Sequence, residues 1–208
     1  ADGGDIAITG TASTNTTQAV SINFTNIYAD GGAINISGGA KQVAFGETGA
    51  NNIGGEAAST DAGDITVRAD NISIAATAGS AAFKNASKLS LISDGVAFSS
   101  AQTLGAGTSV TNIGALQVGR STNTADVSIS GAYTVGGPIS IYGGNLALTA
   151  GLAVTPSTTG SILLKATGDI VTSGARTFST QGGDVTLWAD SDNSGAGRIG
   201  LDDTSSIT

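Results

Sequence analysis

A short phrase with two large aliphatic residues two positions apart returns along the whole chain. It begins as GGDIAI at Gly3 to Ile8 and comes back with small changes as GGAINI, AGDITV, GGPISI, GGNLAL, TGSILL and GGDVTL. Because successive side chains of a strand point to opposite faces, each phrase places its two aliphatic side chains on one side. The pattern predicts short β-strands that have one buried face and follow glycine-rich corners.

The aliphatic pairs are separated by Asn, Ser, Thr and Ala, which can face water, and no helical period of 3.6 residues persists between them. The pairs are Ile6/Ile8, Ile34/Ile36, Ile65/Val67, Ile72/Ile74, Leu89/Leu91, Leu116/Val118, Val127/Ile129, Ile139/Ile141, Leu146/Leu148, Ile162/Leu164 and Val185/Leu187. Self-similarity of this kind predicts a solenoid, in which each repeat buries its apolar face by stacking on its neighbours.

The pairs recur at uneven intervals, from about seven residues between Ile139 and Leu146 to roughly thirty between Ile34 and Ile65. Uneven spacing favours a β-helix, whose coils contain several short strands and corners of variable length, over an array with a rigid period. Parallel crossovers are usually right-handed. We therefore predict an all-β fold, a right-handed parallel β-helix (β-solenoid), as a single domain over residues 1–208. With roughly twenty residues per coil, it would have about ten coils and a length of about 50 Å.

The amino-acid composition excludes several classes of function. The chain contains no cysteine and no histidine. This excludes a Ser-His-Asp or Cys-His catalytic site and a metal site with cysteine or histidine ligands. Eight basic against sixteen acidic residues give a formal charge of −8, so binding to nucleic acid or to an anionic membrane is not expected. No apolar run is long enough for a membrane-spanning helix. We expect no enzyme activity, no cofactor, no metal and no membrane insertion.

The segment from Gln42 to Thr60 weakens the pattern and is expected to bulge from the rod. One interpretation is a recognition loop carried by a rigid scaffold. The other, which we favour, is an elongated corner without a partner.

Aromatic residues are few. We expect all five phenylalanines, Phe24, Phe45, Phe83, Phe98 and Phe178, to be buried in the coil, because they lie within apolar or small-residue stretches. An aromatic platform for carbohydrate around Trp188, Tyr133 or Tyr142 is the alternative function for the remaining rings.

The loop from Asp190 to Gly195, DSDNSG, matches the opening of a calcium loop, with carboxylates at alternate positions and a glycine at the sixth. The match ends at the twelfth position, where Leu201 stands in place of the bidentate acid. We favour an acidic, glycine-rich corner and leave calcium binding open.

Two acidic pairs, Asp61/Asp64 and Asp202/Asp203, resemble the carboxylates of a polysaccharide-cleaving site, but neither has basic or aromatic neighbours to hold a sugar. Turn residues beside glycine are the simpler interpretation. Five triplets that begin at Asn15, Asn23, Asn35, Asn71 and Asn85 have the form of glycan acceptors, and their modification is left open.

The stretches AGDITVRADNISIAA (Ala62 to Ala76) and TFSTQGGDVTLWADSDNSGAGRIGLDD (Thr177 to Asp203) resemble the repeats of filamentous-haemagglutinin-type adhesins, which are exoproteins of bacterial two-partner secretion. This resemblance implies a β-helical shaft, exported unfolded and displayed extracellularly or at the bacterial cell surface. It also implies that residues 1–208 are a segment of a longer repetitive protein.

From these observations we expect a structural and adhesive shaft segment of a surface-exposed or secreted fibrous adhesin. Its expected partners are neighbouring β-solenoid segments or like subunits end to end, and a glycan or protein receptor. Two alternatives remain open: a self-assembling subunit of an extracellular filament, and a carbohydrate-binding or carbohydrate-active β-helix.

Overall fold

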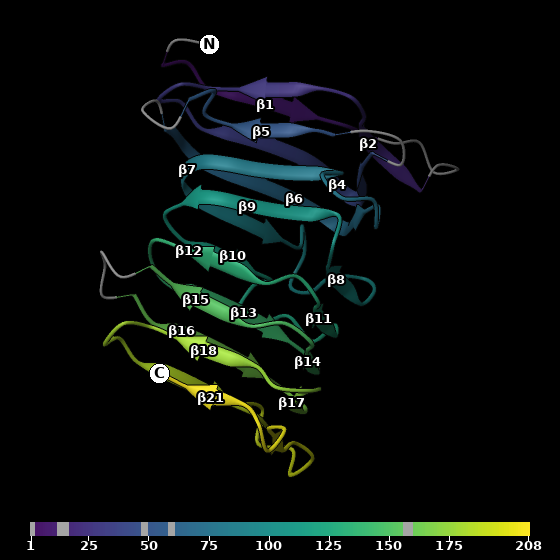
Figure 1. The fold of residues 1–208 in the computed structure, drawn as a ribbon. Helices are drawn as coiled ribbons and strands as arrows, with labels where there is room; N and C mark the ends of the chain where they lie inside the picture. Colours follow the sequence, from purple (N-terminus) through teal and green to yellow (C-terminus); the bar gives the residue numbers. More distant parts are fainter. Residues whose placement is uncertain (1–2, 12–16, 47–49, 58–60, 156–159) are drawn as a thin grey trace.

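The computed structural model describes residues 3–11, 17–46, 50–57, 61–155 and 160–208, and the chain in these ranges winds as a parallel β-solenoid (Figure 1). Each coil makes one circuit of three strand-bearing faces, and the neighbouring strands within these ranges pair in parallel. No helix occurs among the described residues, so none there could span a membrane. The predicted all-β solenoid fold is confirmed.

The strands fall into three sheets. The largest has the order β1 (Ile6–Thr9), β4 (Ile34–Phe45), β6 (Ala62–Ile74), β7 (Ala81–Ile92), β10 (Leu116–Val118), β13 (Ile139–Gly143), β16 (Ile162–Ala166) and β19 (Val185–Trp188), and these strands form the first face. Attached to it are β2 (Gln18–Ile22), β3 (Asn26–Tyr28), β5 (Asn52–Gly54) and β9 (Thr108–Ile113). A second sheet contains β8 (Gln102–Leu104), β11 (Val127–Ile129), β14 (Leu146–Leu148), β17 (Ile170–Thr172) and β20 (Ile199–Gly200). The third contains β12 (Tyr133–Val135), β15 (Leu152–Val154), β18 (Thr177–Ser179) and β21 (Ser206–Ile207).

The aliphatic pairs form the interior, as the sequence predicts. On the first face, two parallel ladders run through eight strands. One ladder is Ile6, Ile34, Ile65, Leu89, Leu116, Ile139, Ile162 and Val185, and the other is Ile8, Ile36, Val67, Leu91, Val118, Ile141, Leu164 and Leu187. The twelve inner members are at most 1% exposed. Burying each such side chain contributes roughly 1.5–3 kcal/mol, so the ladders make a large contribution to stability.

The expected number of coils is wrong. Ile6 and Val185 are the ends of one ladder and lie seven turns apart, whereas the sequence suggested about ten coils. Successive ladder members, such as Ile34 and Ile65, are farther apart in the chain than the roughly twenty residues expected per coil, because the corners are longer. At about 4.8 Å per step, the ladder is about 34 Å long.

The segment from Gln42 to Thr60 does not bulge where the structure describes it. Gln42–Phe45 completes β4, and Asn52–Gly54 forms β5. Val43, Phe45 and Ile53 are at most 1% exposed, so this segment contributes directly to the core. Residues 47–49 and 58–60 lie outside the described residues.

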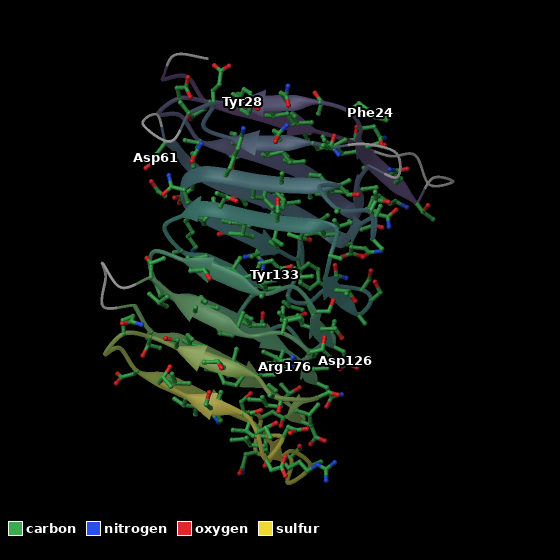
Figure 2. The ribbon with its side chains drawn as sticks, in the orientation of Figure 1. Phe24, Tyr28, Asp61, Asp126, Tyr133 and Arg176 are labelled. Carbon is green, nitrogen blue, oxygen red and sulfur yellow. The ribbon has the colours of Figure 1, made fainter. Side chains whose placement is uncertain are left out.

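Four of the five phenylalanines are buried as predicted, and the rings of Phe45 and Phe83 pack edge to face with centroids 5.7 Å apart. The prediction for Phe24 is wrong. Its side chain is 67% exposed and its backbone has a φ of 48°. It occupies the turn between β2 and β3, where the left-handed backbone turns the ring away from the core (Figure 2).

Candidate functional surfaces

Successive coils are tied together at the corner that precedes the second-face strands. Asp126, Asn145 and Asp169 stand one above another there, and each accepts, through Oδ1, the backbone N–H of the residue in the next coil. The distances are 2.7 Å from Asn145 N to Asp126, 2.9 Å from Asp169 N to Asn145 and 2.9 Å from Arg198 N to Asp169. This corner ladder spans four coils, and it replaces water as the partner of backbone donors that no strand pairs.

Buried amide side chains make a second set of links. Asn51 is fully buried; its Oδ1 accepts from Thr25 N at 3.2 Å and its Nδ2 donates to Ser80 O at 2.6 Å. Thr25 and Ser80 belong to the coils before and after that of Asn51, so one side chain bridges three coils.

Asn123 repeats this arrangement farther along the rod. It is 2% exposed, accepts from Phe98 N at 3.1 Å and donates to Tyr142 O at 2.8 Å. Sequence alone did not reveal either asparagine, because Asn is ordinarily a water-facing residue. Their partners lie one coil away along the chain, at spacings that differ from coil to coil, so no local sequence signal marks them.

Both ends of the described rod present open strand edges. The first-coil strands β1, β2 and β3 pair on one side only, and so do the last-coil strands β19, β20 and β21. The last coil also exposes apolar side chains: Ile199 is 48% exposed, Leu201 38% and Ile207 53%. Unpaired edges beside exposed aliphatic groups are surfaces on which a further β-coil can stack.

The loop from Asp190 to Gly195 is closed by its own hydrogen bonds. Asp190 has a φ of 50°, and its Oδ1 accepts from Ser194 Oγ at 3.0 Å and from Gly195 N at 3.0 Å. The hydrogen bond from the Ser194 hydroxyl, together with those from the loop backbone, lowers the pKa of Asp190 below its ordinary value. In the described ranges, no group of three or more acidic side chains has a metal-binding arrangement. The geometry is that of a hydrogen-bonded turn.

The two acidic pairs lie in different coils, so they do not form one acidic site. Asp61 lies at the start of the third coil, where its Oδ1 accepts from Asn112 Nδ2 at 3.3 Å, and Asp64 is in register with Lys88. Asp202 is in the last coil, far along the rod. Its Oδ1 accepts from Thr204 Oγ1 at 2.9 Å and its Oδ2 from Gly174 N at 3.1 Å, and these bonds, the Thr204 hydroxyl first, lower its pKa. Asp61 and Asp202 each accept hydrogen bonds from another coil, whereas Asp64 lies within β6.

Of the three rings suggested as a carbohydrate platform, Tyr133 is buried, whereas Tyr142 and Trp188 lie on the outside of the rod. Tyr133 is 3% exposed and faces inward, where its hydroxyl donates to Gly105 O at 3.3 Å, and burial raises its pKa to about 12 (Figure 2). Tyr142 and Trp188 lie on the outside of the first face, both in register with Lys165. Trp188 is 50% exposed.

The asparagines of the glycan triplets differ in accessibility. Asn35 and Asn23 are exposed, while Asn85 is buried and its side chain bonds to Gly55 O and to Asn112. Asn71 accepts a hydrogen bond from Gln102. Asn15 lies outside the described residues.

No family model, no curated protein and no solved structure matches this chain. The class that the structure defines is therefore a β-solenoid, and the resemblance to filamentous-haemagglutinin-type repeats stays an expectation from the sequence.

Proposed function

We propose that this chain is a structural shaft segment of a fibrous adhesin that is secreted or displayed at a bacterial cell surface. The observation that supports it most directly is the uninterrupted stacking of two aliphatic ladders through the described coils. A rod built this way is stiff and keeps its two ends at a fixed distance from each other. The corner ladder and the two bridging asparagines add links between coils that resist bending.

The absence of cysteine from the sequence agrees with this proposal, since a solenoid held by stacking does not depend on disulfide formation after export. Exposed Ser, Thr and Asn side chains and a formal charge of −8 keep such rods apart laterally.

The location can be tested on cells that produce the protein. Antibodies raised against the purified chain should label intact cells or the culture medium, and external protease should remove the cell-bound signal without lysis. Labelling that appears only after permeabilisation would contradict a surface role. A cytoplasmic protein detected with the same treatment is the control for cell integrity.

A second candidate, an end-to-end filament subunit, is favoured by the exposed Ile199, Leu201 and Ile207 at the last coil. Light scattering and electron microscopy at rising protein concentration distinguish the two. A shaft segment gives rods of constant length, whereas a filament subunit gives particles that lengthen with concentration. Ile207→Lys should abolish that lengthening, and Thr186→Lys, on an outward position of the first face, is its control.

A further inference from the structure

A line of cationic and aromatic side chains runs along the outside of the first face, parallel to the axis of the rod. Tyr142, Lys165 and Trp188 occupy the same outward position in three consecutive strands. Farther up, Arg68 is in register with Ile92 in the neighbouring strand. Arg120 follows β10 and reaches back one coil, where its Nε donates to Ser93 O at 2.8 Å. We call Arg68, Arg120, Tyr142, Lys165 and Trp188 the cation–aromatic stripe.

Charge sets this stripe apart from the rest of the molecule. The chain carries a formal charge of −8, yet the stripe contains three of its eight basic residues. The acidic partner that the structure pairs with them is Asp94, whose Oδ1 lies 3.2 Å from Arg68 Nε, and that Arg68 side chain remains 48% exposed. The stripe therefore has a local excess of positive charge on an acidic rod.

The shape of the stripe favours an extended ligand. From the strand of Arg68 to the strand of Trp188 there are five inter-strand steps, which amount to about 24 Å. At its upper end, Arg68, Ile92 and Arg120 border a hollow of about 400 Å³. At its lower end, Lys165 Nζ lies 4.7 Å from the centre of the half-exposed Trp188 ring.

These groups match one class of partner. Guanidinium and ammonium groups bind carboxylates by charge-assisted hydrogen bonds, and exposed aromatic rings pack against the apolar faces of sugar rings. We propose that the cation–aromatic stripe binds a strand of carboxylate-bearing polysaccharide laid along the rod. This goes beyond the shaft role, because the binding would hold for the isolated chain wherever the protein is located.

The test measures binding of the purified chain to polygalacturonate, with uncharged dextran, dextran sulfate and single-stranded DNA as the other probes. Polygalacturonate should bind, more weakly as salt rises. Arg120→Gln and Lys165→Gln should each weaken binding about three- to tenfold, and Trp188→Ala about tenfold, equivalent to about 1.4 kcal/mol.

The chain provides a matched control. Lys84 Nζ lies 4.8 Å from the centre of the Tyr28 ring, in the first part of β7, which pairs with β5 and β9. Lys84→Gln therefore removes the same charge and the same type of contact without touching the stripe. Lys84→Gln should change binding by less than about twofold. If binding depended only on the total charge of the chain, Lys84→Gln and Lys165→Gln would weaken it equally. Circular dichroism and melting temperature show that each variant is folded.

Several results would overturn the proposal: no binding of polygalacturonate, equal loss in Lys84→Gln and Lys165→Gln, or equal binding of dextran. If dextran sulfate bound more strongly than polygalacturonate, the stripe would recognise sulfate groups and the proposed preference for carboxylates would be wrong. Binding of single-stranded DNA that is lost in the same variants would assign the stripe to nucleic acid instead.

Discussion

The side-chain amide of Asn123 donates to the carbonyl oxygen of Tyr142 at 2.8 Å while its Oδ1 accepts the backbone N–H of Phe98 at 3.1 Å. Phe98 and Tyr142 belong to coils on either side of Asn123. In a repeat array each coil contacts only its immediate neighbours, so Asn123 links two coils that do not contact each other directly.

Replacing Asn123 by leucine should lower the free energy of unfolding by about 2–3 kcal/mol. The substitution keeps the number and branching of the side-chain heavy atoms but leaves a buried donor and a buried acceptor without partners. Urea unfolding followed by circular dichroism measures the change. Asn35→Leu, at an exposed position of β4, is the control and should change stability by less than about 0.5 kcal/mol.

Leu116→Ala removes a fully buried member of an aliphatic ladder and should destabilise the chain by about 2–5 kcal/mol. Because each coil contacts only its neighbours, the loss should also separate unfolding into two transitions, one for each side of β10. Thr186→Ala, on the outside of the same face, should do neither. A single unshifted transition in Leu116→Ala would show that the ladder is not the source of stability.

Gly54→Ala should prevent folding. The backbone at Gly54 has a φ of 142°, and an added Cβ would fall 1.6 Å from the carbonyl oxygen of Lys84. Gly95→Ala is the matched control, since a Cβ there meets nothing within 4 Å. Soluble expression and circular dichroism compare the two variants. A normally folded Gly54→Ala protein would mean that β5 and β7 lie farther apart than described.

Alkaline pH should destabilise the protein through Tyr133. Burial raises its pKa to about 12 from 10.0, so the neutral ring is favoured in the folded state. The contribution to stability is complete below about pH 10 and is lost as the pH rises from 10 to 12. Tyr133→Phe should reduce this loss, as measured by urea unfolding at several pH values. Tyr142→Phe, on the outside of the first face, should retain it.

The sequence predicted the interior better than the corners. Pairs such as Ile139/Ile141 specify their strand and their buried face by local alternation alone, and they align in register as expected. The number of coils was wrong because corner length has no comparable local signal. Phe24 was misplaced because nothing in its apolar neighbourhood reveals a positive φ.

Candidate surfaces were harder to predict than the core. Tyr142 and Trp188 are distant in the chain, and only two successive turns of equal length bring them into one outward column. The same is true of Asn51 and Asn123, whose partners are one coil away. Such residues could be identified only after the length of each turn was known.

Three consecutive turns, from Leu116 through Ile139 and Ile162 to Val185, have equal length on the first face, and each of them is one complete unit of the rod. A tandem duplication of one such turn would insert a complete coil and leave every strand before and after it in register. Genetic recombination between such units would lengthen or shorten the protein in increments of about 4.8 Å, so its reach can evolve without a change in its core.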